Sequence, residues 1–311
     1  LGIRAPPLDD PALVLRGAGH FETGCSPCHG NPDNRNPPIA GQMMPEPPYL
    51  PDVVGSWTPP QLFTIVKHGI KFAGMPAWPA SERDDEVWAV VAFLLELPRL
   101  DGGGYRALVH GDTSNDHGSA ELAGLVMQLE GAGAALTRCA RCHGICGEVR
   151  GNAAFPRLAG QHAPYLLRSL EAYASGARPS GIMQPVAAAL RPEQMRALAQ
   201  YFSALPPAPA LPPSDPEAAA VGESIARDGV PAARVPACSD CHGPFPHDAP
   251  IDPHYPRLAG QWADYLEQQL RLFREGIRGG TAYREIMAHV GLRLDDEQIR
   301  AVAAYYAALS P

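Results

Sequence analysis

Three copies of one short pattern decide the fold of this chain: Cys25-Ser-Pro-Cys28-His29, Cys139-Ala-Arg-Cys142-His143 and Cys238-Ser-Asp-Cys241-His242. In each copy two thiols are three positions apart, about one helical turn, and an imidazole follows directly. The next residue is glycine every time, namely Gly30, Gly144 and Gly243. The seventh cysteine, Cys146, lies outside the pattern. We predict that it is a small buried hydrophobe, with a redox-active or intermolecular thiol as the alternative.

C-x-x-C-H is the attachment pattern of haem c. Two thiols on one helical turn can reach the two vinyl groups of one porphyrin, and the histidine that follows can bind the iron. A zinc site would need two C-x-x-C pairs close together, but these pairs are about 100 residues apart. A thioredoxin-like pair would need a βαβ context, which the pattern lacks. The sequence therefore predicts three covalently bound haem c groups with His29, His143 and His242 as proximal iron ligands.

Internal repeats divide the chain into three parts rather than the two that its 311 residues alone would suggest. Phe155-Pro-Arg-Leu-Ala-Gly-Gln161 recurs 100 residues later as Tyr255-Pro-Arg-Leu-Ala-Gly-Gln261, and 38–42 is a shorter version. Gly-rich and Pro-rich segments separate the parts. We expect domains at 1–104, 120–205 and 217–311, joined by linkers at 105–119 and 206–216.

Each part has the pattern of a small helical domain. A helix is expected at or before the cysteine motif, then a loop rich in proline and glycine, then short helices and a terminal helix. The terminal helices follow turns with acidic residues, at 84–86, 191–193 and 295–297, where negative charge suits the helix dipole. No run of alternating β-branched residues indicates a sheet. The predicted fold class is all-α.

Each domain resembles class I c-type cytochromes. Domains two and three resemble cytochrome c4-type domains, with C-x-x-C-H-G, Phe/Tyr-Pro-x-Leu-Ala-Gly-Gln and Tyr-Leu in the order of that family. Domain one resembles membrane-anchored monohaem cytochrome c domains, through 57–63, 67–71 and Gly74-Met-Pro-Ala-Trp78. The resemblance implies three tandem cytochrome c domains, each wrapped around one haem.

The same resemblance implies a methionine as the sixth iron ligand of each haem. The matching residues are Met75, Met183 and Met287, and the last two are each seven positions before a leucine. His289 is an alternative to Met287, and the other methionines considered are Met43, Met44, Met127 and Met195. The resemblance also implies that a proline carbonyl accepts the N–H of each proximal histidine, from Pro38, Pro156 and Pro256.

Iron with histidine and methionine ligands has no open position for a substrate, so we expect no catalytic residue and a chain that is an electron carrier rather than an enzyme. Methionine ligation raises the potential, which suits the oxidising end of respiration. The first alternative is a cytochrome subunit of a multi-subunit membrane-bound dehydrogenase or oxidase. The second is a haem enzyme such as a peroxidase.

Charge and hydropathy restrict the classes of partner and the location that the sequence allows. The net charge is −8 with a pI of about 5.8, and no basic stripe suggests a nucleic-acid partner. Redox proteins, such as a respiratory donor and an oxidase, are the expected partners. Haem attachment outside the cytoplasm predicts a periplasmic protein or one on the outer face of the cytoplasmic membrane. No apolar run is long enough to span a membrane, but an anchor before Leu1 stays an expectation from the domain-one resemblance.

Overall fold

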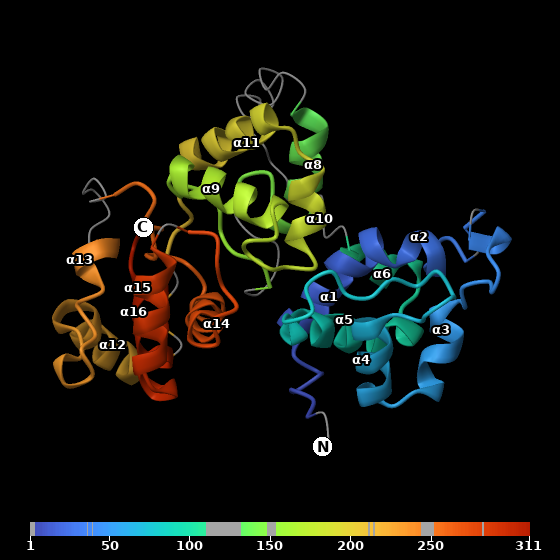
Figure 1. The fold of residues 1–311 in the computed structure, drawn as a ribbon, viewed down its shortest axis with the longest axis horizontal. Coiled ribbons are helices and arrows are strands. Elements are labelled where there is room, and N and C mark those ends of the chain that lie inside the picture. Colours follow the sequence, from blue (N-terminus) through green and yellow to red (C-terminus); the bar gives the residue numbers. More distant parts are fainter. Residues whose placement is uncertain are drawn as a thin grey trace. The chain divides into compact units, whose positions relative to one another are not determined.

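The computed structural model describes residues 4–35, 37–38, 40–109, 132–147, 154–210, 212–213, 215–243, 252–281 and 283–311. These residues form helices and loops, with three isolated β-bridges and no strand among them. The all-α prediction is therefore confirmed (Figure 1). No helix of the described part is long and apolar enough to cross a membrane.

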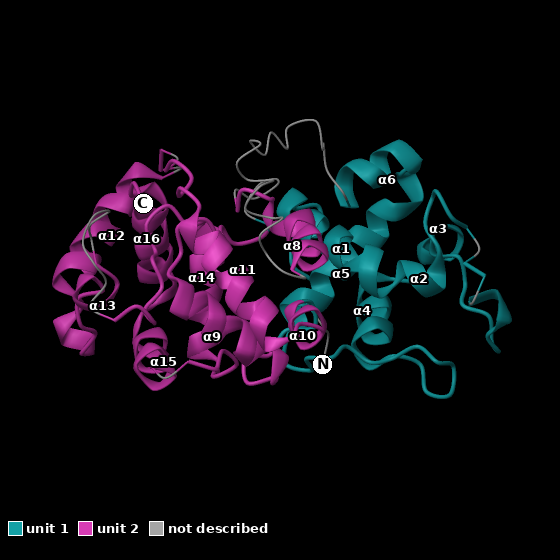
Figure 2. Cartoon of the chain, turned by 90° about the horizontal axis from the view of Figure 1, so that it is seen from above, with its two compact units in different colours: residues 1–117, 150–154, 180–182 teal, residues 118–149, 155–179, 183–311 magenta. Residues whose placement is uncertain are grey.

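The chain divides into two compact units (Figure 2). The first unit contains residues 1–117, 150–154 and 180–182, and the second contains the remainder. The helices described in the first unit are α1 (Pro11–Gly24), α2 (Ser26–His29), α3 (Leu50–Val53), α4 (Pro59–His68), α5 (Asp84–Glu96) and α6 (Gly102–Val109). Short 3₁₀ turns, η1 (Ala40–Gln42), η2 (Val54–Ser56) and η3 (Leu97–Arg99), connect some of them.

The core of the first unit lies where α5 packs against α1 and α4. Helix α1 begins at Asp10, whose carboxylate accepts the N–H of Ala12 at 2.9 Å. Helix α5 begins at the acidic turn that the sequence indicated, and nine of its residues are buried. The rings of Phe21 and Phe93 lie 5.1 Å apart in this core.

Residues 105–109 of the predicted first linker are helical and packed. Asp101 starts helix α6, because its carboxylate accepts the N–H of Gly104 at 2.7 Å. Tyr105 is only 1% exposed and packs against the rings of Phe21 and Phe93. The three glycines at 102–104 therefore form the first turn of a helix instead of ending the domain. The rest of that linker, 110–119, lies outside the described residues.

The second unit contains two halves, which we define by their described residues: 132–147, 155–179 and 183–210 form the first half, and 215–311 contains the second. The first half contains α8 (Gly133–His143), α9 (Ala163–Ala174), α10 (Met183–Ala188) and α11 (Pro192–Ala204). The second half contains α12 (Pro216–Asp228), η5 (Pro231–Ala233), α13 (Ser239–His242), α14 (Ala263–Arg274), α15 (Arg284–Arg293) and α16 (Asp296–Ala308). Each half has its own apolar core. The terminal helices α11 and α16 begin at the turns that the sequence predicted.

Glycine allows two pairs of helices to pack closely. In the first unit, a Cβ at Gly17 of α1 would lie 2.0 Å from the carbonyl oxygen of Ala89 in α5. In the second unit, a Cβ at Gly222 of α12 would lie 2.0 Å from the carbonyl oxygen of Ala301 in α16. Neither position tolerates a side chain without movement of a backbone, so the contacts α1–α5 and α12–α16 are made in the same way.

Gly17→Ala is therefore expected to destabilise the first unit. Forcing a methyl group against a backbone carbonyl in a packed core costs about 1–3 kcal/mol. Urea unfolding followed by far-ultraviolet circular dichroism measures the loss. Gly55→Ala is the matched control, because a Cβ at Gly55 would meet no atom within 4 Å. Equal midpoints for the two variants would contradict this account of the packing between α1 and α5.

Candidate haem sites

Each C-x-x-C-H motif lies on a helical turn that ends at its histidine. His29 ends α2, His143 ends α8 and His242 ends α13. The glycine that follows has a positive φ of 67° to 71° in all three places. A Cβ at Gly30 would lie 2.5 Å from the carbonyl oxygen of Arg35, so the chain can turn sharply away from the motif only at glycine. Each turn thus presents two sulfur atoms and one imidazole together.

A proline carbonyl orients each motif histidine. The Nδ1–H of His29 donates to Pro48 O at 2.9 Å. The Nδ1–H of His143 donates to Pro156 O at 3.1 Å, and that of His242 donates to Pro256 O at 3.0 Å. A carbonyl oxygen can only accept, so the proton is on Nδ1 and the lone pair is on Nε2. Burial lowers the pKa of His143 and of His242. These imidazoles are neutral and are ready to bind a metal through Nε2.

Pro156 and Pro256 are confirmed as the acceptors of the second unit, but the prediction of Pro38 as the acceptor from His29 is wrong. In the first unit the acceptor is Pro48, 19 residues after His29, whereas the spacings in the second unit are 13 and 14 residues. The loop of the first unit is longer, and the residues that resemble the repeat form the turn η1 instead. A cavity of about 290 Å³ adjoins Cys28 and His29, and residues 47–49 line its other side.

The first cysteine of each motif packs against an apolar core. Cys25, Cys139 and Cys238 contact the cores of the first unit and of the two halves of the second. Burial raises the pKa of Cys25 to about 12, with a smaller contribution from Cys28, and burial raises the pKa of both Cys139 and Cys238 to about 11. Neutral thiols facing apolar side chains suit thioether bonds to an apolar macrocycle, whereas a zinc site needs thiolates. The set of donors therefore fits haem c. Cys146 is half-buried.

A tight hairpin carries Met75 in the first unit. The N–H of Ile70 donates to Met75 O at 3.1 Å in an isolated β-bridge, and Gly69 beside it has a φ of 64°. A Cβ at Gly69 would lie 2.5 Å from Met75 O. Met75 is half-buried. Of the two alternatives nearby, Met44 is 93% exposed, and the methyl group of Met43 lies beside Gly74 in this hairpin.

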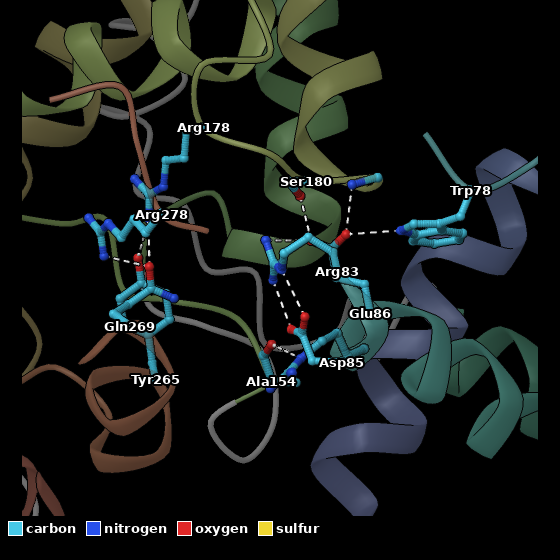
Figure 3. Close-up of polar contacts among 12 residues, drawn as sticks. Trp78, Arg83, Asp85, Glu86, Ala154, Arg178, Ser180, Tyr265, Gln269 and Arg278 are labelled. Atoms are coloured by element: carbon cyan, nitrogen blue, oxygen red, sulfur yellow. Dashed lines mark hydrogen bonds and ion pairs between the residues drawn. The ribbon is translucent and has the colours of Figure 1, made fainter. Parts of the chain in front are cut away.

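A buried carboxylate fixes the chain just after this hairpin (Figure 3). Glu86 accepts hydrogen bonds from Trp78 Nε1 at 3.2 Å, from the Ser180 hydroxyl at 2.6 Å and from the Gly181 N–H at 2.6 Å, all within the first unit. It also pairs with Arg83 at 3.0 Å. Burial raises the pKa of Glu86, although Arg83 opposes that shift. Four donors around one carboxylate hold Trp78, three residues after Met75, in a single position.

The two other methionines predicted as ligands begin or belong to short helices of the second unit. Met183 is the first residue of α10, and Met287 lies in α15; both are half-buried. Met287 packs against the core of the second half, while the side chain of His289 is exposed. Met195 is buried in α11 as a core residue. Met127 lies outside the described residues.

The repeated Pro-Arg-Leu-Ala-Gly-Gln segments bind each other in the second unit. Gln161 Nε2 donates to Arg257 O and Gln261 Nε2 donates to Arg157 O, both at 3.0 Å. The N–H of Arg257 donates to Gln161 Oε1 at 2.8 Å, and that of Arg157 donates to Gln261 Oε1 at 3.0 Å. These four reciprocal bonds, which we call the glutamine clasp, join the loops that hold Pro156 and Pro256.

Sequence reasoning found the repeat but missed the clasp. Both glutamines are buried, and the half-buried His162 donates from its Nδ1–H to Tyr255 O at 2.8 Å. The segment after α11 is also bound, because Pro209 O accepts a hydrogen bond from Arg157 at 3.1 Å. The sequence did carry a signal for this contact, because six consecutive residues recur unchanged at 156–161 and 256–261. A loop that served only its own haem would not require so long an identity.

The all-α fold and three C-x-x-C-H sites of this geometry define a multi-haem class I c-type cytochrome. Residues 129–206 and 228–310 match the family model described as "Cytochrome c", and residues 12–94 match the one described as "Cytochrome C oxidase, cbb3-type, subunit III". The chain belongs to the cytochrome c family. It therefore carries covalently bound haem c, with one attachment motif in each of the three matched segments.

Relatives agree with this assignment. The chain is 39% identical over 186 residues to the "Thiosulfate dehydrogenase electron acceptor" of Stutzerimonas stutzeri (strain A1501), covering 57% of this chain and 81% of that protein. It is 37% identical over 175 residues to cytochrome c4 of Thiocapsa roseopersicina, covering 55% and 87%. The crystal structure of reduced cytochrome c4 from Pseudomonas stutzeri aligns with a TM-score of 0.52 at 31% identity, covering 58% of this chain and 98% of that one.

Gln161→Ala is expected to destabilise the second unit. The change leaves the N–H of Arg257 without its partner in a partly buried position, which costs about 1–3 kcal/mol. Urea unfolding of the holoprotein measures the difference from the unaltered chain. Gln200→Ala is the control, because Gln200 is exposed on α11. A midpoint no lower than that of the control would show that the clasp does not stabilise the unit.

Proposed function

We propose that this electron-transfer cytochrome works outside the cytoplasm as a chain of three haem domains: 1–104 extended by the packed helix α6 to Val109, 120–205 and 217–311. It would pass single electrons between a respiratory donor and a terminal acceptor such as an oxidase. The observation that carries the proposal is the repeated arrangement of two thiols and one imidazole whose Nδ1–H is bound to a proline carbonyl. Fusing the domains replaces diffusional encounters between haems by a high effective concentration.

The proposed covalent attachment residues are Cys25, Cys28, Cys139, Cys142, Cys238 and Cys241. The proposed axial ligands are His29 with Met75, His143 with Met183, and His242 with Met287. When bound, the haem iron supplies the one-electron chemistry. The chain holds each imidazole in one tautomer, keeps the apolar side of the site dry, and closes the sixth position with a thioether. A thioether favours ferrous iron over a second imidazole, so the potentials are expected to be high.

The name of one relative indicates a class of donor. Because that relative is an electron acceptor of thiosulfate dehydrogenase, we propose that a dehydrogenase of this kind reduces the present chain. The net charge of −8, made more negative by haem propionates, would steer a partner with a basic docking surface. Covalent haem attachment supports a location in the periplasm or on the outer face of the cytoplasmic membrane.

A second candidate function rests on the first domain. Residues 12–94 match the model of a cbb3-type oxidase subunit, which favours a role as a cytochrome subunit of a membrane-bound complex. The two candidates share the same haem chemistry and differ in whether the partner stays bound. Purification from native membranes separates them: a stable stoichiometric partner supports the subunit, and a free chain supports the carrier.

Met75→His is expected to lower one of the three midpoint potentials and to leave the other two unchanged. The reason is that a second imidazole stabilises ferric iron relative to a thioether. Spectroelectrochemical titration of the holoprotein measures all three potentials. Met44→His is the control, because Met44 is exposed. Three unchanged potentials in the Met75 variant would exclude Met75 as an iron ligand.

The donor proposal predicts fast reduction of the oxidised protein by thiosulfate dehydrogenase in the presence of thiosulfate. Stopped-flow absorbance of the haem bands under anaerobic conditions measures the rate. The rate should fall as ionic strength rises, because salt screens the attraction between an acidic chain and a basic partner. Reduction no faster than with thiosulfate alone would reject this donor while leaving the haem assignments intact.

A further inference from the structure

A short piece of the second predicted domain belongs to the first compact unit. Residues 180–182 are part of the first unit, although the chain on both sides of them is part of the second. Ser180 and Gly181 are buried, and the side chain of Ile182 packs against the apolar core of the first unit. Met183, the proposed sixth ligand of the second haem, follows directly. The chain thus reaches Met183 from a segment that the first unit holds.

The carboxylate of Glu86 binds this segment (Figure 3). Its Oε1 accepts the hydroxyl of Ser180 at 2.6 Å, and its Oε2 accepts the N–H of Gly181 at 2.6 Å. Glu86 is only 3% exposed, so water competes little for these bonds. Hydrogen bonds to an ionised carboxylate are about twice as strong as those between neutral groups. Two of them on adjacent residues fix the backbone of the segment as well as a side chain.

The indole of Trp78 packs on the same segment. A Cβ at Gly181 would lie 2.3 Å from Cε2 of Trp78, so only glycine lets the chain lie this close to the ring. Trp78 Nε1 donates to Oε2 of Glu86 at 3.2 Å, the oxygen that Gly181 also uses. The indole is itself fixed, because its centroid lies 4.5 Å from that of His20 and its backbone N–H donates to Lys67 O at 3.0 Å.

Arg83 keeps the carboxylate of Glu86 in this orientation. Its Nη1 lies 3.0 Å from Glu86 Oε1. Its Nε and Nη2 donate to the two carboxylate oxygens of Asp85, each at 2.8 Å. A guanidinium held at both ends fixes the group that it binds, because neither side chain can rotate without breaking these bonds. The acceptor for residues 180–181 is therefore in place before the segment binds.

The first unit makes a second contact of this kind before Pro156. Arg16 in α1 donates from Nε to Ala154 O at 3.2 Å, and Ala154 also belongs to the first unit. Pro156, which accepts the N–H of His143, follows two residues later. The first unit thus holds the chain two residues before Pro156 and two residues before Met183. Both axial sides of the second haem depend on segments that it fixes.

We propose that Glu86 is a positioning residue for the sixth ligand of the second haem, and that it keeps Met183 on the iron by fixing residues 180–181. This inference rests on the proposed ligation of that haem by His143 and Met183, not on the donor or acceptor. A methionine leaves ferric iron when its segment opens locally, and an external ligand can then enter. Contacts that hold the segment closed lower the population of this open state.

Glu86→Gln in the full holoprotein tests the proposal. The change keeps the shape of the side chain, removes its charge and replaces one acceptor oxygen by an amide donor. Stopped-flow absorbance of the ferric haem bands with excess imidazole measures how fast methionine is displaced. One of the three haems should bind imidazole about tenfold faster, as expected from loss of one hydrogen bond to a charged group. The other two should be unchanged.

Glu82→Gln is the matched control, because it removes the same charge from an exposed position just before α5. Rates in the Glu86 variant no faster than those of this control would overturn the proposal.

Met183→His assigns the faster phase to a haem. A second imidazole from the chain leaves no methionine to displace at this haem, so the double variant with Glu86→Gln should lack the phase. Persistence of the phase would place it at the haem served by Met75 and overturn the proposal. A Met183→His chain that binds imidazole as the unaltered chain does would show instead that the proposed ligation is wrong. The two failures are therefore distinguishable.

Ser180→Ala keeps the test decisive if the Glu86 variant does not fold or bind haem. It removes one donor to the carboxylate and leaves Glu86 in place. The same haem should bind imidazole faster, by a smaller factor than in the Glu86 variant. Ser175→Ala is the control, because Ser175 is exposed at the end of α9. Equal rates in the two serine variants would overturn the proposal.

Discussion

The hydrogen bond from each motif histidine to a proline carbonyl joins segments that lie 13 to 19 residues apart, and the rest of each haem site depends on it. Because the carbonyl can only accept, it fixes the tautomer and leaves Nε2 as the metal donor. The left-handed glycine after each histidine lets the chain leave the motif and return with the proline. The first cysteine of each motif anchors the same turn to an apolar core.

In the second unit these local sites are joined into one structure. The glutamine clasp connects the two loops that hold Pro156 and Pro256. Arg178 and Arg278, in the loops before Met183 and Met287, donate to the hydroxyls of Tyr265 and Tyr165 on helices of the opposite half. Each haem site is thus supported by residues of the other half. This arrangement gives a physical reason why the two halves form one compact unit.

Much of this could be predicted from the sequence, because haem attachment needs fixed residue types at fixed spacing. The motifs and the all-α class follow from such patterns, and the proline acceptors of the second unit follow from the resemblance to class I c-type cytochromes. Pro48 could not be selected, because the longer loop of the first unit contains several prolines and spacing does not decide among them. The helical turn at 102–104 was hidden by its glycines, since Asp101 and the burial of Tyr105 outweigh their low helix propensity. The clasp depends on how the two repeats pack: the unchanged recurrence of Pro-Arg-Leu-Ala-Gly-Gln indicates a shared role, but it does not show that the two copies bind each other.

The central claim is that the chain holds three closed haem c sites that carry electrons. A haem count per chain, combined with reduced-minus-oxidised spectra recorded with and without carbon monoxide, tests this claim most directly. The account predicts three haems that stay attached after denaturation and a reduced spectrum that carbon monoxide does not change, because a methionine fills each sixth position. Fewer than three attached haems, or rapid binding of carbon monoxide to the native reduced protein, would contradict it.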